Sequence, residues 1–272
     1  MSIIEAIILG VIQGLTEFLP VSSSGHIELG KAILDVQLAD PLLFSIVVHG
    51  ATALSTIVIF RTIILDLFRG LFSFKWNEET QYVFKIVLSM IPVGVVGIMF
   101  EEQIEELFDG NVFFVGLMLL FTGVLLYLTT KAKEKTGDVT FKNAFIVGLV
   151  QAVAILPGIS RSGSTIAASL LLGINKSKAA QFSFLMVLPP ILGTLLLKVL
   201  KFMELSGDPL TATDLTVTPP VILTAGFLAA FISGLFACQW MIKIVRKSKL
   251  QYFAYYCFAV GAIAITYTLI GA

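Results

Sequence analysis

Long apolar segments separated by short polar loops cover most of the chain. Two further stretches, Ile3–Ile33 and Ala144–Ile174, each consist of two shorter apolar arms on either side of a break rich in Pro, Ser and Gly. A membrane span requires about 20 mostly apolar residues. Six segments meet this requirement: Pro41–Phe60, Tyr82–Phe100, Val112–Thr130, Gln181–Lys201, Pro219–Ile242 and Gln251–Ile270.

Broken backbone at membrane depth persists only where protein buries it or where it lines a cavity. The two broken stretches are therefore expected to be re-entrant helix pairs, which enter the membrane, turn near its middle and leave on the same side. The predicted fold is an all-α polytopic membrane protein with six transmembrane helices and two re-entrant helix pairs.

The two broken stretches are copies of each other at an offset of 138 residues. Matching positions are Ala6 and Ala144, Gly10 and Gly148, Gln13 and Gln151, Ser22 and Ser160, Gly25 and Gly163, and Ser45 and Ser183. Pro20 and Pro157 miss this register by one residue, so the two turns should differ in detail. We expect a single membrane domain, 1–272, with repeat halves 1–136 and 137–272. Three spans in each half would invert the second half, giving an inverted-topology repeat.

Lysine and arginine gather in loops that the repeat places on one side of the membrane. They lie in or beside the segments 61–85, 131–142, 176–178 and 243–249, whereas the segment 101–110 has none. By the positive-inside rule, the first group faces the cytoplasm. The first re-entrant pair then enters from outside and the second from inside, with their tips facing each other. An acidic run in the outer loop is expected to be a solvated face: Glu101, Glu102, Glu105 and Glu106.

Composition supports a membrane protein. The chain has 272 residues, of which 57% are hydrophobic and 13% charged, whereas soluble domains carry about 25% charged residues. A formal net charge of zero gives no sign of a nucleic-acid partner. Cys238 and Cys257 lie in separate apolar segments without ligand spacing, so we expect packing roles. The N-terminus lacks the basic start and cleavage pattern of a signal peptide and is expected to belong to the mature protein.

Polar residues inside the first broken stretch are candidates for chemistry, because intramembrane carboxylates are costly and usually functional. Gln13 and Glu17 are four residues apart and share one face of a helix. Their oxygens suit a hard divalent cation, Mg²⁺ or Ca²⁺, which commonly binds through one or two carboxylates and substrate phosphate. The alternative is a buried Glu17 that bonds to nearby hydroxyls or to Arg161 without a metal.

A proline and a serine triplet follow Glu17. Pro20 breaks the first arm, and one of the serines at 22–24 can cap the next helix. Capping alone would explain the triplet, but His26 lies within one helical turn of Ser23. An imidazole there could take a hydroxyl proton or protonate a leaving group. His49 has no motif around it, and we expect it to be structural.

The second broken stretch carries P-G-I-S-R-S-G-S-T from Pro157 to Thr165, with Arg161 at its centre. The guanidinium is always charged and presents a fork matched to phosphate oxygens. Backbone N–H groups at the start of a helix also bind anions. We expect Arg161 to bind phosphate, and the alternative is a structural ion pair with Glu17 between the two tips. Hydroxyls and glycines surround the arginine: Ser160, Ser162, Ser164, Thr165, Gly158 and Gly163.

Together these motifs resemble the undecaprenyl-diphosphatase family of the bacitracin-resistance type. They are Q-G-L-T-E-F-L-P-V-S-S-S-G-H at Gln13–His26 and the arginine motif at Pro157–Thr165. Gln13 and Glu17 satisfy the family pattern of Glu or Gln, three residues, then Glu, and many members have Glu at the first position. The number of spans, the chain length and the repeat also agree. The resemblance therefore covers essentially the whole chain.

The resemblance implies hydrolysis of undecaprenyl diphosphate to undecaprenyl phosphate and phosphate, which recycles the lipid carrier of bacterial cell-wall synthesis and gives bacitracin resistance. It implies that Glu17 is a catalytic or metal-binding carboxylate with Gln13 beside it. Ser23 is then the nucleophile, His26 the acid/base and Arg161 the clamp on the diphosphate. Supporting substrate-binding groups are Ser160, Ser162, Thr165, Ser22 and Gly163.

The expected partners are the lipid substrate and the bilayer, with a divalent cation as cofactor and without nucleic acid; a homodimer is left open. The expected location is the bacterial inner (plasma) membrane, with several passes. The alternative function is a transporter or flippase of polyprenyl phosphate or another anion, since inverted repeats and broken helices suit a carrier. A third interpretation, a scaffold with a structural polar core, predicts that Arg161→Ala mainly destabilises the fold.

Overall fold

The computed structural model describes residues 1–36, 41–100, 103–104, 107, 111–132, 136–207, 218–247 and 249–271. Within these ranges the regular elements are helices, and an isolated β-bridge joins Gly137 to Ile174. The predicted all-α class is confirmed. The acidic run Glu101, Glu102, Glu105 and Glu106 and the lysines at 133 and 135 lie outside the described residues.

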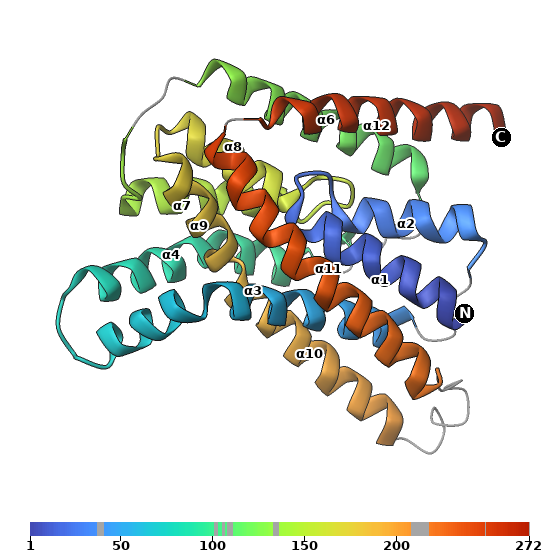
Figure 1. Ribbon diagram of the computed structural model, residues 1–272, viewed down its shortest axis with the longest axis horizontal. Helices are drawn as coiled ribbons and strands as arrows, with labels where there is room; N and C mark the ends of the chain where they lie inside the picture. The colour runs from blue at the N-terminus through green and yellow to red at the C-terminus, as the bar shows by residue number, and fades with distance from the viewer. Residues whose placement is uncertain are drawn as a thin grey trace.

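The described helices follow one another along the chain without a domain-sized gap (Figure 1). They are α1 (Ile3–Phe18), α2 (Ser23–Leu34), α3 (Pro41–Leu71), α4 (Glu78–Met99), α6 (Val112–Leu128), the 3-10 turn η1 (Thr129–Lys131), α7 (Phe141–Val153), α8 (Arg161–Leu171), α9 (Lys176–Met186), α10 (Leu188–Gly207), α11 (Pro220–Arg246) and α12 (Gln251–Gly271).

Six of the described helical stretches are long and apolar enough to cross a membrane, as the sequence predicted. They are Leu43–Leu71, Glu78–Met99, Val112–Lys131, Lys176–Leu200, Pro220–Arg246 and Gln251–Ile270. The two broken stretches form the shorter pairs α1–α2 and α7–α8.

Two spans differ from their predicted form. Helix α3 continues past Phe60 to Leu71, because a charged residue ends an apolar run but not a helix; Arg61 donates to the carbonyl oxygen of Val58 within α3 at 2.8 Å. The span predicted as one helix at 181–201 is divided at Val187 into α9 and α10. The second and third residues of α10 are prolines, which lack an N–H and are tolerated in the first turn of a helix but not in its interior.

Small residues allow the helices to approach closely. Helix α1 packs along α11, α7 along α4, and α6 along α12, and Figure 1 shows α6 and α12 side by side at one edge. A Cβ added to Gly14 would lie 2.4 Å from the carbonyl oxygen of Ala230, and one added to Gly148 would lie 2.4 Å from that of Ser89. Such contacts replace the hydrophobic driving force, which is weak between helices in a bilayer.

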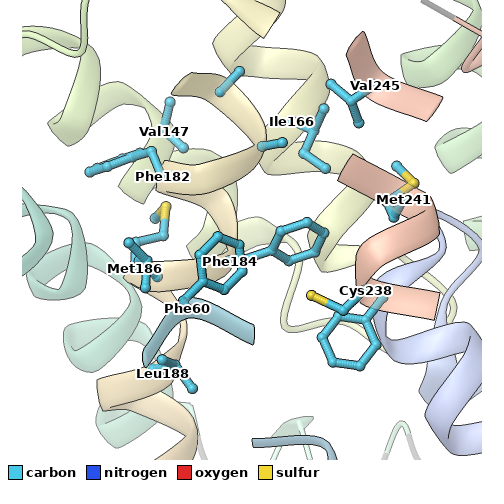
Figure 2. Close-up of a cluster of buried hydrophobic side chains, with 14 of the residues drawn as sticks. Phe60, Val147, Ile166, Phe182, Phe184, Met186, Leu188, Cys238, Met241 and Val245 are labelled. Atoms are coloured by element: carbon cyan, nitrogen blue, oxygen red, sulfur yellow. The ribbon is translucent and has the colours of Figure 1, made fainter. Parts of the chain in front are cut away.

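A cluster of buried apolar side chains joins α3, α7, α8, α9 and α11 (Figure 2). The ring centroid of Phe184 in α9 lies 5.8 Å from that of Phe18 and 6.1 Å from that of Phe60. Because Phe18 is the last residue of α1, this cluster fixes the position at which the first break begins. Cys238 belongs to the same cluster; it and Cys257 are free and buried, which confirms the predicted packing roles.

The close approach of α7 to α4 gives a prediction for stability. Replacement of Gly148 by Ala places a Cβ against the α4 backbone, so we expect the free energy of unfolding in detergent to fall by about 1–3 kcal/mol. The matched control is Gly94→Ala on α4, where an added Cβ meets nothing within 4 Å. Thermal unfolding of both variants would measure this, and equal melting temperatures would contradict the packing described here.

Candidate active site

Each broken stretch begins its second helix with a serine cap. Ser22 caps α2 by accepting a hydrogen bond from the N–H of Gly25 at 3.2 Å, and Ser160 caps α8 by accepting one from Gly163 at 3.1 Å. Ser22 has φ 71, a left-handed conformation that costs a non-glycine residue energy and that clusters at functional sites. The first break spans residues 19–22 and the second 154–160, so the two turns differ, as the misaligned prolines predicted.

The two breaks contact each other. The hydroxyl of Ser162 lies 3.3 Å from the carbonyl oxygen of Leu19, to which it donates. A Cβ added to Gly25 would lie 3.4 Å from the Cα of Gly158. Gly158 has φ +92, a conformation that glycine adopts without steric cost. The turn of one pair is therefore shaped to receive the turn of the other.

A single carboxylate connects the two breaks. One oxygen of Glu17, Oε1, accepts a hydrogen bond from Nη2 of Arg161 in an ion pair. The other oxygen, Oε2, accepts one from the Ser23 hydroxyl at 2.7 Å and one from Nε2 of Gln13 at 3.0 Å. Four of the residues singled out in the sequence thus meet at one point, and Glu17 is only 8% exposed.

Ser23 and Arg161 are the first residues of α2 and α8, and they are also equivalent positions at the repeat offset. The Glu17 carboxylate therefore bridges the N-terminal ends of two helices. Helix N-termini carry a partial positive charge and stabilise anions. Chemically, the site can hold an oxyanion between the two helix starts, and its carboxylate can accept the proton of the Ser23 hydroxyl.

His26 does not face Ser23. Its Nδ1 lies 2.8 Å from the carbonyl oxygen of Ser22, and its Nε2 lies 2.8 Å from the hydroxyl of Tyr256 in α12. The expected contact between the imidazole and the Ser23 hydroxyl is replaced by the Ser23–Glu17 hydrogen bond. The group that receives a hydrogen bond from Ser23 is therefore a carboxylate rather than an imidazole.

The other predicted substrate-binding groups shape the second break. The Thr165 hydroxyl donates to the carbonyl oxygen of Arg161 at 2.9 Å, within its own helix. The hydroxyls of Ser160 and Ser162 lie 3.4 Å apart. Ser160, Ser162 and Thr165 are all buried, and Gly163 supplies the N–H that Ser160 caps.

His49, which we expected to be structural, donates its Nδ1–H to the carbonyl oxygen of Ser45 at 2.9 Å, within α3. The Nζ of Lys198 in α10 lies 3.5 Å from the hydroxyl of Ser45. These contacts hold the side chain of His49 on its own helix, and its structural role stays a prediction.

The second repeat copy contains buried polar side chains without hydrogen-bond partners in the described part of the chain. They are the amide of Gln151 and the hydroxyls of Ser164 and Ser183, all at most 3% exposed. Their equivalents in the first copy make polar contacts: Gln13, His26 and Ser45. Among the described residues, these three positions thus make polar side-chain contacts in the first copy and not in the second.

Sequence reasoning missed three side chains that support the breaks from spanning helices. Thr122 in α6 accepts a hydrogen bond from the N–H of Ser160 at 3.0 Å. Cys257 in α12 lies 3.6 Å from the carbonyl oxygen of Pro20. The third side chain is Tyr256 in α12, whose hydroxyl lies 2.8 Å from Nε2 of His26. Each lies in an apolar span, where a threonine or tyrosine usually bonds within its own helix or faces the interface, so no motif marks it.

The residues around Glu17 provide few ligands for a metal. Among the described residues, no group of three or more His, Cys, Asp and Glu side chains is placed to hold an ion. However, Oε1 of Gln13 is buried without a hydrogen-bond partner in the described part of the chain, on a side chain that contacts Glu17. One carboxylate and one amide oxygen are a donor set that Mg²⁺ and Ca²⁺ accept when phosphate and water complete the coordination.

Comparison with known proteins agrees with the motifs at the two breaks. Residues 6–263 match the family described as bacitracin resistance protein BacA. The chain belongs to this family. Membership, together with the six apolar helices, makes it a multi-pass membrane protein.

Relatives cover nearly the whole chain and share one name. A protein of Christiangramia forsetii named undecaprenyl-diphosphatase is 57% identical over 270 residues, 98% of each chain. Proteins of the same name from Parabacteroides distasonis and Bacteroides fragilis are 51% and 52% identical. They match 99% and 96% of this chain and 100% and 96% of their own.

The ion pair between the two breaks gives a prediction about coupling. Glu17→Gln and Arg161→Gln should each lower the free energy of unfolding by roughly 3 kcal/mol, because each leaves a buried charge without its partner. The double variant should be more stable than the sum of the two losses predicts. Thermal unfolding of the four proteins in detergent would measure this coupling, and strictly additive losses would argue against the pair.

Proposed function

We propose that this chain is an integral-membrane phosphatase that hydrolyses undecaprenyl diphosphate to undecaprenyl phosphate and phosphate. By recycling the lipid carrier of cell-wall synthesis, it would give bacitracin resistance. The relatives' shared name and the family description support this assignment. The observation that carries it is the Glu17 carboxylate, which connects a serine hydroxyl and an arginine at the starts of two helices.

The position of the Glu17 carboxylate supports a phosphate site. Its oxygens accept hydrogen bonds from Ser23 and Arg161 as the oxygens of a bound phosphate would. The guanidinium of Arg161 has five N–H donors, so it can turn its fork to a substrate phosphate and remain close to Glu17. With the lipid tail in the bilayer, positioning and charge neutralisation supply most of the catalysis of phosphoryl transfer.

In the first step, the Ser23 oxygen attacks the terminal phosphorus. The bond from that phosphorus to the bridging oxygen breaks, undecaprenyl phosphate leaves, and the hydroxyl proton passes to Glu17. The 2.7 Å hydrogen bond from Ser23 to Glu17 supports this direction of proton transfer.

In the second step, water attacks the phosphoserine, the bond from phosphorus to the Ser23 oxygen breaks, and Ser23 regains its proton from Glu17. His26 takes the proton of the attacking water as general base, through the Tyr256 hydroxyl that bonds to its Nε2. Direct attack of water on the diphosphate, positioned by the same groups, is the alternative.

Ser22, Ser160, Ser162, Gly163 and Thr165 complete the substrate site in this proposal. Ser22 and Ser160 cap α2 and α8, and Ser162 and Gly163 lie in the first turn of α8. Thr165 follows in the second turn, where its hydroxyl supports the carbonyl oxygen of Arg161. Donors in the first turn of a helix point toward an anion at its N-terminus. We therefore assign them to binding and orienting the diphosphate and not to proton transfer.

A divalent cation, Mg²⁺ or Ca²⁺, would be held by Glu17 and the free Oε1 of Gln13, together with phosphate oxygens of the substrate. When bound, it would neutralise negative charge on the diphosphate. Glu17 can serve as ligand and as hydrogen-bond acceptor at once, because a carboxylate offers about four lone-pair positions.

We assign the pairs α1–α2 and α7–α8 to re-entrant hairpins in an inverted-topology repeat with halves 1–136 and 137–272. The packing between the halves supports this arrangement. At the repeat offset, α1 corresponds to α7 and α4 corresponds to α11. Helix α1 of the first half packs along α11 of the second, and α7 of the second half packs along α4 of the first. The basic loops would face the cytoplasm of a bacterium, with the chain in the inner (plasma) membrane. A homodimer stays a prediction.

A transporter or flippase of polyprenyl phosphate is not favoured, because the relatives are named after a hydrolytic activity. The two functions separate in one assay. A phosphatase releases phosphate from undecaprenyl diphosphate in detergent solution, whereas a carrier without hydrolytic activity releases none.

The serine pair at the start of α2 provides a matched test of the nucleophile. We expect Ser23→Ala to lower kcat for phosphate release by about 1,000-fold or more, because it removes the attacking oxygen. The control, Ser24→Ala, alters the neighbouring serine, whose hydroxyl lies 3.3 Å from that of Ser22, and should retain activity within about tenfold. Acid-quenched protein should carry phosphate on Ser23, and full activity of Ser23→Ala would exclude the covalent route.

The free amide oxygen of Gln13 provides a test of the cation. EDTA should abolish phosphate release by the wild-type protein, and Mg²⁺ or Ca²⁺ should restore it. Gln13→Glu adds a second carboxylate and should lower the Mg²⁺ concentration for half-maximal activity by roughly tenfold, whereas Gln13→Ala should raise it. Metal titrations of the three proteins would measure this; unchanged activity in EDTA would remove the cation from the proposal.

A further inference from the structure

The imidazole of His26 is held at both nitrogens. Nδ1 lies 2.8 Å from the carbonyl oxygen of Ser22, and because a carbonyl only accepts hydrogen bonds, Nδ1 carries a proton. Nε2, 2.8 Å from the Tyr256 hydroxyl, is therefore the nitrogen at which His26 gains or loses its proton. The rings of His26 and Tyr256 are nearly parallel, with centroids 5.6 Å apart and an interplanar angle of 16°.

A phenol suits a group that changes its protonation state. Its hydroxyl donates to the lone pair of a neutral imidazole and accepts from the N–H of an imidazolium. The ring of His26 can thus keep one orientation in both states. Phenylalanine would retain the ring contact but could neither donate a hydrogen bond to the neutral imidazole nor accept one from the imidazolium.

Helix α12 is fixed against the first break independently of this hydrogen bond. The next residue, Cys257, lies 3.6 Å from the carbonyl oxygen of Pro20 and is fully buried in a cluster with Val21 and Val115. The preceding residue, Tyr255, turns instead toward α6, where its ring centroid lies 6.4 Å from that of Tyr127. Of the two adjacent tyrosines, only Tyr256 has its hydroxyl on the imidazole.

The surroundings of the pair offer few other polar partners. The sequences of α6 and α12 contain no Asp, Glu, Lys, Arg or His. On α1, Glu17 is bonded to Ser23 and Arg161, and Glu5 is in a capping box at the other end of the helix. The orientation of the imidazole therefore depends on the phenol and on the Ser22 carbonyl.

The second repeat copy shows that the scaffold does not need this pair. At the offset of 138 residues, Ser164 stands in the place of His26 and Met118 in that of Tyr256. The Ser164 hydroxyl is buried without a hydrogen-bond partner in the described part of the chain. The helix pair α7–α8 nevertheless forms with α6 packed against α8. A polar pair at this position is thus a property of the first repeat copy, which contains Glu17 and Ser23, and not a requirement of the fold.

From this geometry we propose that Tyr256 holds the imidazole of His26 in one orientation and relays its proton. The Tyr256 hydroxyl gives its proton to Nε2 and takes one from water, and the same path runs in reverse when His26 releases the proton. The proposal rests on the proposed function, because it assigns Tyr256 a role through His26 in the hydrolysis of a lipid diphosphate. Tyr256 does not itself contact the phosphate.

The test compares Tyr256→Phe with Tyr255→Phe, a matched control that removes the neighbouring hydroxyl from the same helix. For phosphate release from undecaprenyl diphosphate, Tyr256→Phe should lower kcat by about 10- to 100-fold, as expected for loss of a hydrogen bond to a group that becomes charged. It should leave KM within about threefold, and Tyr255→Phe should keep both constants within about twofold. Melting temperatures confirm that the variants are folded.

A second comparison separates positioning from packing. In a His26→Ala background, Tyr256→Phe should have no further effect on kcat, because residues that act as a unit are not additive. An equal loss in both backgrounds would show that Tyr256 acts by packing and would overturn the proposal. A Tyr256→Phe protein with wild-type kcat would overturn it as well.

A measurement without substrate keeps the proposal independent of the assay. The ¹⁵N NMR spectrum of the protein labelled at histidine should show His26 as the Nδ1–H tautomer, with the Nε2 resonance shifted in Tyr256→Phe and unchanged in Tyr255→Phe. If Tyr256→Phe shows this shift but the wild-type protein releases no phosphate, the proposed function is refuted and the His26–Tyr256 contact is not. An Nε2 resonance unaffected by Tyr256→Phe would refute the contact itself.

Discussion

A buried charge needs a compensating partner, and the arrangement of both breaks depends on the partners that Glu17 contacts. Its carboxylate receives an ion pair from Arg161 and a hydrogen bond from Ser23, and each of these residues begins a helix. To deliver two helix N-termini to one carboxylate, the chain must break two helices and bring the breaks together. The proline and glycine residues of the breaks and the serine caps follow from that requirement.

The surrounding helices keep the breaks in contact. Glycines on α1 and α7 allow these short helices to lie directly against the backbones of α11 and α4. The Phe184 ring packs against the end of α1, and side chains on α6 and α12 bond to backbone atoms of the two turns. Because a bilayer contributes little to helix association, this close packing and these few hydrogen bonds must supply the rigidity that the site needs.

The hydrophobic pattern was sufficient for the fold class and for the six spans, because span length and apolar content are set by the bilayer and not by neighbouring residues. It also located both breaks, since proline and glycine act on the local backbone. It misjudged the length of α3 and the division between α9 and α10. Hydropathy measures burial in lipid, whereas a helix ends where its backbone hydrogen bonds end.

For the site, the sequence by itself determined which residues are too costly to lie in a membrane without a role: Gln13, Glu17, Ser23, His26 and Arg161. It could not determine which of them touch. Helical spacing suggested that Ser23 and His26 would pair, but Ser23 bonds to Glu17 and His26 to Tyr256, 230 residues away in sequence. Spacing along a helix limits which side chains share a face, and only the packing of α8 and α12 against the first break decided which partner each polar group reached.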